Sequence, residues 1–403
     1  MLTPAWCRRL LGGKERRIAM IVALLSCAPN AGAAQLAAPI HVEARALLDI
    51  GGANAVGPAQ LARVRGVMRL AGGVIVVADA GSSELRYFTA AGGHIRTAAG
   101  RGSGPGEVEG FDAAVAVDDS IYAFDQRGPL VVFDSGGRYV RRIELGENPP
   151  GMTFGWPRGV MRGGAVAGLR WRMTIRTLGE LQADSTLLVV KAASGGEERV
   201  LARYPRWEGF ELRAGARPAP RAFSGDVVLA TAARELCAGF SRTFDITCRD
   251  AAGRLTRRIT MPNAERPVTE AMRSGLRRAL GGIAPDGSQR LQGAPRTARE
   301  ALARSMEFAR TLPEFSRLLI ARDDRLWVRI AEPEDFFPRW GGSPARVASR
   351  WRLFERSGER TRDVILPASF DLFDAGADWV LGVQWDEDDA EHVVMYRLQG
   401  ARR

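Results

Sequence analysis

Two features of the 403-residue sequence predict an all-β fold of six four-stranded sheets arranged in a ring. The first is an internal repeat with a period of about 45 residues. The second is the content of each repeat, which consists of short apolar or alternating runs separated by glycine and aspartate turns. One such sheet cannot bury both of its faces, so the sheets must stack around a common axis. The predicted fold class is therefore a six-bladed β-propeller.

The repeat is clearest in two neighbouring segments. One apolar run ends at Asp79 and the corresponding run ends at Asp125, 46 positions later. The next run of each segment ends at Phe88 or Phe133, 45 positions apart. The one-residue difference falls in a loop, where insertions are tolerated. The same pattern returns more weakly at 244–259, 325–330, 351–358 and 379–385.

The expected propeller occupies residues 34–403. Its blades are predicted at 55–100, 108–147, 152–206, 220–262, 315–367 and 370–399. The last blade has three runs instead of four. Residues 40–50 can supply the missing strand, so that the two ends of the chain pair within one blade and close the ring.

Residues 264–314 interrupt the β pattern between the fourth and fifth blades. Helical periodicity is expected over 267–280 and again over 297–310. Thr297 is placed to cap the second helix, with Glu300 three residues later. The sequence therefore predicts a short helical insertion.

The region around the second blade resembles an NHL-type repeat. The match is good over about 70–145, looser over 315–399 and poor over 150–220. It is most similar to the six-bladed β-propeller proteins that environmental bacteria export, and this resemblance implies both the fold and export. It implies no single activity, because related propellers include binding modules, lyases and lactonases. The residues that carry the resemblance are 101–107, 114–117, 121–125, 132–134 and 137–142.

The first 33 residues are typical of a secretory signal peptide. Basic residues precede the apolar run 18–27, which is followed by Pro29 and a stretch of small residues. The apolar run is too short to span a bilayer. Cleavage is expected after Ala33, which places the mature chain outside the cytoplasm in the periplasm or beyond the cell.

A lipid-anchored form is the alternative. Leu24 to Cys27 resembles the bacterial lipobox, in which the cysteine is lipidated and becomes the new N-terminus. A lipid on Cys27 would hold the protein at a membrane surface without a transmembrane span. No later apolar run is long enough to predict a transmembrane helix, and we expect a monomer.

The formal net charge of +11 does not indicate a nucleic-acid partner. Lysine occurs only at Lys14 and Lys191, so all but two of the 57 basic residues are arginine. The arginines are scattered along the chain with acids between them, whereas a nucleic-acid surface gathers them into a stripe. We therefore expect no nucleic-acid binding.

Cys237 and Cys248 flank a predicted turn between two short strands. Cross-strand cysteines can approach closely enough for a disulfide, and an exported protein meets oxidising conditions. The sequence predicts a disulfide between them, with two reduced apolar residues as the alternative. Two cysteines without a nearby histidine do not indicate a metal site.

The most promising binding surface is one rim of the expected ring. The helical insertion and the loop 331–345 both emerge at that rim. Long loops that carry aromatic residues favour recognition. We predict that Phe336, Phe337 and Trp340 contact a ligand there. The alternative is that they only pack the helices onto the ring.

No catalytic motif stands out in the sequence. The three histidines lie on separate segments, and no Gly-x-Ser-x-Gly elbow is present. The predicted function is therefore a binding module for a ligand or protein, with no catalytic residue, metal or cofactor. The alternative is a metal-dependent lyase or lactone hydrolase that resembles the gluconolactonase-type propellers, with calcium or another divalent ion held at the axis by carboxylates and amides. The scarcity of asparagine, with four in the whole chain, argues against it.

Overall fold

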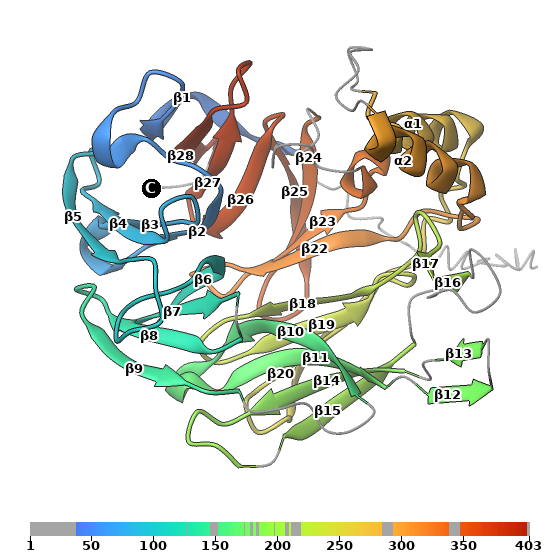
Figure 1. Ribbon diagram of the computed structural model, residues 1–403, viewed down its shortest axis with the longest axis horizontal. Coiled ribbons are helices and arrows are strands. Elements are labelled where there is room, and N and C mark those ends of the chain that lie inside the picture. Colours follow the sequence, from blue (N-terminus) through green and yellow to red (C-terminus); the bar gives the residue numbers. More distant parts are fainter. Residues whose placement is uncertain are drawn as a thin grey trace, which may run out of the picture. The chain divides into compact units, whose positions relative to one another are not determined.

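The computed structural model describes residues 38–126, 128–145, 152–172, 174–177, 180–182, 185–196, 198–205, 209–210, 219–283, 293–337 and 347–400. The chain divides into two compact units, Met1–Leu36 and Ala37–Arg403. The described residues all belong to the second unit. The described residues of this unit form mainly β-strands, with two α-helices and a propeller-like arrangement of sheets (Figure 1).

Four antiparallel sheets of four strands follow one another along the chain. The first contains β2 (Val64–Arg69), β3 (Ile75–Asp79), β4 (Glu84–Phe88) and β5 (His94–Ala99). The second contains β6 (Phe111–Val117), β7 (Ser120–Asp125), β8 (Leu130–Asp134) and β9 (Tyr139–Ile143). The third contains β10 (Met152–Val160), β11 (Val166–Arg172), β14 (Thr186–Lys191) and β15 (Arg199–Tyr204). The fourth contains β18 (Val227–Thr231), β19 (Leu236–Phe240), β20 (Asp245–Arg249) and β21 (Leu255–Thr260).

The remaining long strands form one eight-stranded sheet. In spatial order they are β22 (Phe315–Ile320), β23 (Leu326–Ile330), β24 (Ser349–Phe354), β25 (Arg360–Leu366), β1 (Ile40–Gly51), β28 (Glu391–Leu398), β27 (Trp379–Trp385) and β26 (Phe370–Ala375). Figure 1 shows the red strands β27 and β28 beside the blue β1. The expected pairing of residues 40–50 with the last strand is therefore present.

The sheet count corrects the expectation of six separate blades. The described residues form four separate four-stranded sheets and the eight-stranded one. The cause is the length of β1, which has 12 residues. Its first two residues, Ile40 and His41, pair in parallel with β25, and the rest of the strand pairs antiparallel with β28. One strand thus joins two groups that the repeat predicts as separate.

Two small hairpins extend the regular sheets. β12 (Thr174–Thr177) pairs with β13 (Glu180–Gln182), and β16 (Gly209–Phe210) pairs with β17 (Ala219–Pro220). The repeat pattern does not predict them. Short 3-10 turns occur at Gly57–Ala59, Ala71–Gly73, Arg162–Gly164 and Pro333–Phe336.

The first strands of successive sheets lie against one another, from β2 to β6, β10, β18 and β22, and β26 contacts β2. Glycine allows these inner strands to approach closely. A Cβ atom on Gly66 of β2 would lie 2.6 Å from the carbonyl oxygen of Ala114 in β6. A Cβ on Gly159 of β10 would lie 1.9 Å from Oγ1 of Thr231 in β18. Both distances are too short for any side chain, so the inner contacts depend on glycine.

The core lies between neighbouring sheets. All five residues of β3 are buried, and so are all five of β23. A strand buried on both faces needs a continuous apolar run instead of an alternating one. Val76 and Leu85 of the first sheet, for example, form one apolar cluster with Phe111 and Ile121 of the second. The sheets therefore bury their faces by stacking, as the repeat implies.

The two helices lie in the predicted insertion. Helix α1 (Glu270–Leu280) begins after Thr269, whose side chain accepts a hydrogen bond from the Met272 backbone at 3.3 Å. Helix α2 (Gly293–Ser305) begins before Thr297, so the expected cap at Thr297 is wrong. It also ends five residues early, because Phe308 forms a parallel β-bridge with Ala222. No helix in the described part of the chain is long and apolar enough to cross a membrane.

Candidate functional site

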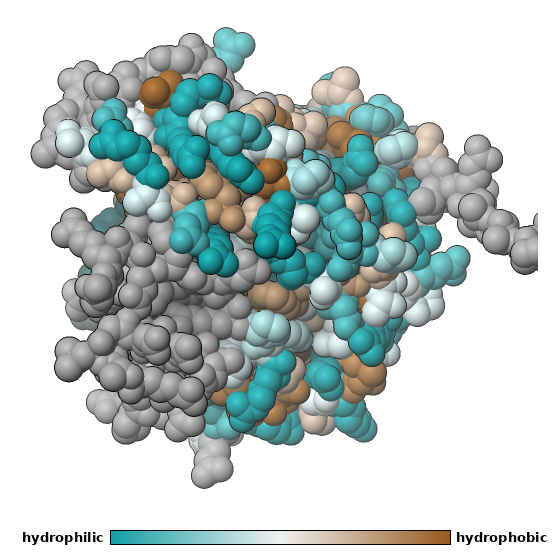
Figure 2. All heavy atoms as spheres, turned by 90° about the vertical axis from the view of Figure 1, so that its right-hand side faces the viewer, coloured by the Kyte–Doolittle hydropathy of each residue, from teal (hydrophilic) through white to brown (hydrophobic). Residues whose placement is uncertain are grey.

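A hollow of about 740 Å³ lies beside α1 and the segment that follows α2. We call it the arginine pocket, because five of the nine described residues that line it are arginines. The lining residues are Arg221, Arg242, Arg273, Arg277, Glu307, Phe308, Ala309, Arg310 and Thr311. Figure 2 looks onto the side of the molecule that carries α1 and α2, and hydrophilic residues mixed with small apolar spots cover most of its coloured part.

Backbone pairing holds the segment after α2 in place. The Ala222 N–H donates to the carbonyl oxygen of Glu307 at 2.8 Å, and the Ala309 N–H donates to that of Ala222 at 2.9 Å. These bonds place Phe308 between the helices and the chain that leads into β18. The pocket floor is therefore fixed by main-chain geometry, although it lies in a connecting segment.

Helix α1 supplies one wall of the pocket. Arg273 and Arg277 are four residues apart, so they share one face of the helix. The Arg277 guanidinium carbon lies 4.9 Å from the centroid of the Phe308 ring, and that of Arg273 lies 5.9 Å from it. Both guanidinium groups also face Glu270, at 3.5 Å and 3.6 Å. The stacking and the shared carboxylate hold both cations at the pocket.

The opposite wall comes from the sheet side of the unit. Arg242 Nη1 donates to the carbonyl oxygen of Thr311 at 2.8 Å and to its Oγ1 at 3.0 Å. Arg221 Nε donates to Glu307 Oε2 at 2.8 Å. Glu307 is the one acid among the nine lining residues. The described lining thus brings five positive groups and one negative group together, and Glu270 beside it adds a second negative group.

Two of the three aromatic residues predicted for the site lie next to α1. Phe336 and Phe337 pack against a buried cluster that includes Phe223 and Leu276. The rings of Phe223 and Phe336 meet edge to face with centroids 5.3 Å apart. Phe337 lies close to Gly275 of α1. These contacts are those expected if the two phenylalanines only pack the helices onto the sheets. Their contact with a ligand remains a prediction. Trp340 lies outside the described residues.

Phe336 also borders a smaller hollow of about 340 Å³ between β18, β22 and the loop after β23. Asp335 lies in the same lining, where it forms a buried ion pair with Arg329. Ser316 Oγ donates to Asp335 Oδ2 at 2.6 Å, and the Glu332 N–H donates to it at 3.1 Å. This network fixes the loop on which Phe336 and Phe337 stand.

A third hollow, of about 790 Å³, is lined by the inner strands and by the turns after them. We call it the inner-strand hollow. The four acids in the described part of its lining are all paired with arginines. Asp118 pairs with Arg162 at 2.7 Å, Glu235 with Arg257 at 2.7 Å, Asp324 with Arg356 at 3.2 Å and Asp374 with Arg322 at 2.8 Å.

Asp374 is the most buried of these acids. Burial raises the pKa of its carboxyl, which Arg322 and backbone N–H groups partly offset. Its Oδ2 accepts a hydrogen bond from the Arg69 backbone at 3.0 Å, and its Oδ1 accepts one from the Ala375 backbone at 3.0 Å. Asp374 therefore links the ends of β2 and β26 and serves the architecture of the unit.

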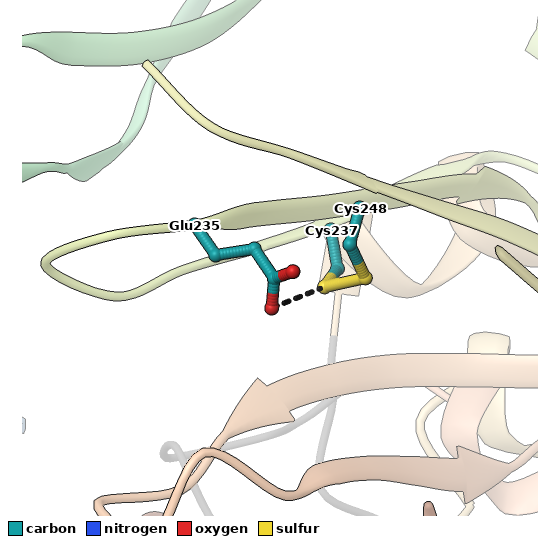
Figure 3. A group of neighbouring side chains, drawn as sticks. All are labelled: Glu235, Cys237 and Cys248. Atoms are coloured by element: carbon teal, nitrogen blue, oxygen red, sulfur yellow. Dashed lines mark hydrogen bonds between the residues drawn. A yellow bond between two sulfur atoms is a disulfide. The ribbon is translucent and has the colours of Figure 1, made fainter. Parts of the chain in front are cut away.

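Cys237 and Cys248 are directly opposite each other on β19 and β20 and are joined by a disulfide. Figure 3 shows Glu235 beside this bond, with its carboxylate 3.7 Å from the Cys237 sulfur. Among the described residues, these three form the one group of three side chains whose atom types and spacing could hold a metal. The disulfide occupies both sulfur atoms, so the group does not fit a metal site. Cys27, the lipidation candidate, lies outside the described residues.

The arginines of the pocket were missed by the sequence analysis. They lie far apart in the chain, and the bias toward arginine hides them among many others. One local signal was available. Arg273 and Arg277 have the spacing that places two cations on one face of a predicted helix. Combined with the long insertion, that spacing could have directed attention to this wall.

No family model matches the chain, and no curated protein matches it. Among solved structures, a DUF4221-family member from Bacteroides vulgatus is similar, with 8% identity, a TM-score of 0.52 and coverage of 89% of this chain and 98% of that chain. A Bacteroides fragilis protein described as exported has 12% identity, a TM-score of 0.45 and coverage of 87% and 93%. Regucalcin from Agrobacterium tumefaciens, a calcium-binding protein, has 11% identity, a TM-score of 0.39 and coverage of 91% and 100%. At such low identity, the similarity concerns the fold alone.

Proposed function

We propose that this protein is an extracytoplasmic six-bladed propeller that binds a ligand or protein partner without catalysis, at the face that carries the helical insertion. Within the eight-stranded sheet, β22–β25 form the fifth blade, and β26–β28 with β1 form the sixth. In this proposal residues 1–33 are the signal peptide, and Cys27 is the lipidation site if the chain is anchored. The segment 101–142 is an NHL-like repeat.

The observation that carries the proposal is the origin of the arginine pocket. Its walls come from α1, from the segment after α2 and from the chain ends next to β18 and β19. The repeat needs none of the helical insertion to close a ring. Added segments that create a hollow at the rim of a rigid scaffold are typical of binding sites.

The rival function is a metal-dependent lactone hydrolase or lyase. It needs several carboxylates that converge without counter-charges on a metal at the axis. In the described part of the inner-strand hollow, every lining acid has an arginine partner within 3.2 Å. Paired carboxylates are poor candidates for a resident divalent ion, since the arginine already supplies the positive charge.

The first test measures turnover. The purified protein is incubated with glucono-δ-lactone in the presence of calcium, manganese or zinc, and acid release is followed in a pH-stat. We expect a rate equal to that of the buffer. Metal-dependent acid release that is lost in Asp374→Asn would support the rival and end the non-catalytic proposal.

The second test measures binding. Small metabolites and oligosaccharides are screened for shifts in melting temperature with the wild type and with the Arg273→Gln/Arg277→Gln variant. We expect stabilising compounds whose effect disappears in the variant, because a ligand that binds only the folded state stabilises it by mass action. Stabilising compounds that act equally on both proteins would place binding elsewhere. The intact mass of the secreted protein separates cleavage after Ala33 from lipidation at Cys27.

A further inference from the structure

We infer that the smaller hollow beside Phe336 binds a small neutral ligand that carries several hydroxyl groups and one apolar face, such as a hexose. This inference rests on the proposed binding function and names a ligand chemistry for the same face of the molecule. We call this hollow the serine hollow, because Ser224, Ser241 and Ser316 line it. The observations that lead to it are the polar groups of the lining, its apolar part, its size and the strained backbone beside it.

The serine hydroxyls give the hollow groups that both donate and accept hydrogen bonds. Ser316 Oγ donates to Asp335 and keeps its lone pairs as acceptors. Ser241 Oγ accepts a hydrogen bond from the Asp226 N–H at 3.0 Å and keeps its O–H as a donor. The half-buried Ser224 makes no hydrogen bond through its hydroxyl to any residue that the structure describes. Hydroxyl groups of a ligand also donate and accept, so they match this lining.

Both carboxylates in the described lining are already engaged within the fold. Asp335 pairs with Arg329, and its Oδ2 accepts a hydrogen bond from Ser316 Oγ at 2.6 Å. Asp226 Oδ1 accepts one from the Val227 N–H at 2.7 Å. A carboxylate offers about four lone-pair sites, so each can still accept a hydrogen bond from a ligand hydroxyl. The lining therefore suits hydroxyl donors and does not require a charged ligand.

Apolar side chains form the rest of the described lining. They are Leu169, Val227, Val228, Leu229, Phe315 and Phe336. The C–H groups of a sugar ring form an apolar face, and packing that face against such side chains removes it from water. Pockets for small molecules combine an apolar lining with a few polar groups in this way. A hexose therefore complements both parts of the lining.

The size of the hollow limits the ligand to one or two rings. Its volume of about 340 Å³ lies near the lower end of the range of roughly 300–1,000 Å³ that is typical of pockets for small organic molecules. A longer chain would extend beyond the lining that selects it.

The backbone beside the hollow is strained, which is an observation independent of the lining. Phe223 has a φ of 60°, in the left-handed region that is unfavourable for a bulky side chain. Its ring is buried and meets that of Phe336 edge to face, with centroids 5.3 Å apart. Ser224 and Asp226 follow directly and enter the lining. Residues in such conformations cluster at ligand-binding sites, so the strain favours a binding role for this segment.

Saturation-transfer NMR with matched sugars tests the inference. The neutral probes are D-glucose, D-galactose and D-mannose, and the charged probes are the 2-amino and uronic acid derivatives of the hexose that binds. We expect at least one hexose to bind with a Kd on the order of 1 mM, as its dozen or so heavy atoms allow. Both charged derivatives should bind at least about tenfold more weakly, because the engaged acids leave a ligand charge without compensation.

Two outcomes of this titration overturn the inference. The first is that none of the three hexoses binds. The second is that the amino derivative binds more tightly than its parent hexose, which would show that the acids of the hollow select a cation.

Matched serine variants locate the site. Ser224→Ala should weaken hexose binding about fivefold, as expected for the loss of one hydrogen bond, and should not change the melting temperature. Ser103→Ala removes a hydroxyl from an exposed serine outside the lining and should leave the affinity unchanged. Equal effects of the two variants would place the hexose elsewhere and overturn the inference.

An aromatic variant tests the apolar side of the hollow. Phe336→Leu keeps an apolar side chain in the contact with Phe223 and should weaken hexose binding about threefold, since less apolar surface is covered. Its melting temperature shows whether the loop has kept its packing. A folded Phe336→Leu protein that binds the hexose as tightly as the wild type would show that the apolar face of the sugar does not contact this ring, and the hexose assignment would be wrong.

The inference and the proposed function fail separately. Hexose binding should be unchanged in Arg273→Gln/Arg277→Gln, because neither arginine lines the serine hollow. If no hexose binds, the assignment of the serine hollow is wrong, while binding at the arginine pocket still stands. Metal-dependent turnover of a lactone instead overturns the proposed function.

Discussion

The arginine pocket and the inner-strand hollow have similar sizes and similar numbers of arginines, but they differ in how those charges are balanced. Among the described residues, five arginines and one acid line the arginine pocket, and Glu270 beside the pocket faces two of these arginines. The inner-strand hollow also has five arginines, at Arg65, Arg234, Arg317, Arg322 and Arg356, and it has four acids. Each of those acids pairs with an arginine.

The two hollows also differ in the elements that their charged pairs connect. Around the inner-strand hollow, the pairs connect neighbouring sheets, as Asp374 of β26 does with Arg322 after β22. Around the arginine pocket, Arg221 pairs with Glu307, and Glu270 lies between Arg273 and Arg277 at the edge of one helix. Charge balance therefore distinguishes the two hollows better than size does.

The largest expected effect tests the structural side of this comparison. Asp374→Ala should lower the free energy of unfolding by about 3 kcal/mol, because it removes the partner of Arg322 and leaves two backbone N–H groups without their acceptor. Arg277→Gln in the arginine pocket should change it by less than about 0.5 kcal/mol. Urea denaturation of both variants measures the two values.

An exposed acid outside both hollows provides the control for Asp374. Asp388→Ala removes the same charge from an exposed turn and should leave the stability within about 0.5 kcal/mol of the wild type. If Asp374→Ala and Arg277→Gln destabilise the protein equally, charge balance does not separate the two hollows.

The disulfide gives the second prediction, because it supports one wall of the inner-strand hollow. Arg257 pairs with Glu235 and lies 3.9 Å from the Cys237 sulfur. The bond links residues only 11 positions apart. Cys237→Ala/Cys248→Ala should lower the free energy of unfolding by about 2 kcal/mol, since the unfolded chain regains the freedom of that loop.

The readout for the disulfide combines stability with binding. In reducing buffer, the free energy of unfolding of the wild type, measured by urea denaturation, should fall toward that of the double alanine variant. Binding at the arginine pocket should remain within about twofold in that variant, since the two regions share no lining residue. A large loss of binding would show that the hollows are coupled.

The repeat could be read from the sequence because it has a local cause. Asp79 Oδ1 accepts a hydrogen bond from the Gly81 backbone at 2.7 Å, and its Oδ2 accepts one from Ala62 at 3.3 Å. Asp125 Oδ2 accepts one from the Glu109 backbone at 3.2 Å. The equivalent aspartate thus accepts a hydrogen bond from the incoming chain in both sheets. A contact between two residues of the same repeat, here 16 or 17 positions apart, recurs with the period of the chain and is visible in it.

The double pairing of β1 and the end of α2 could not be read in this way. The parallel contact of Ile40 and His41 with β25 joins residues more than 300 positions apart. It depends on where the last sheet lies and not on any local pattern. The early end of α2 likewise depends on the bridge from Phe308 to Ala222, a tertiary contact that overrides helical propensity.

The candidate site was predicted only as a region. The insertion and the loop that carries Phe336 and Phe337 were identified, and both lie next to the arginine pocket. The pocket's own residues were not identified, because Arg221, Arg242 and Arg310 come together only after the chain has folded. In a sequence with so many arginines, no single one stands out.

His392 gives the prediction with the smallest expected effect on stability. Its protonation tests whether a cation that is paired with acids stabilises the fold. Its Nδ1 lies 2.8 Å from Asp49 Oδ1 of β1, and its Nε2 lies 3.3 Å from Asp386 Oδ2. Partial burial lowers the pKa of the ring, but the hydrogen bonds to these two acids raise it more, so the pKa lies above its usual 6.5. The protonated ring therefore stabilises the pairing of β1 with β28.

Because the pKa of His392 is raised in the folded state, the free energy of unfolding should fall as the pH rises. The contribution is complete below pH 6.5, the ordinary value for the unfolded chain, and it is lost as the pH rises through the higher pKa of the folded state. We expect a loss of about 0.5 kcal/mol between about pH 6 and about pH 8, because solvent screens a partly exposed pair. His392→Gln should remove this part of the pH dependence. His94→Gln should retain it, since His94 bonds to Thr97 Oγ1 at 3.0 Å instead of to an acid. Equal pH profiles for the wild type and His392→Gln would show that a cation placed between two acids does not stabilise this fold.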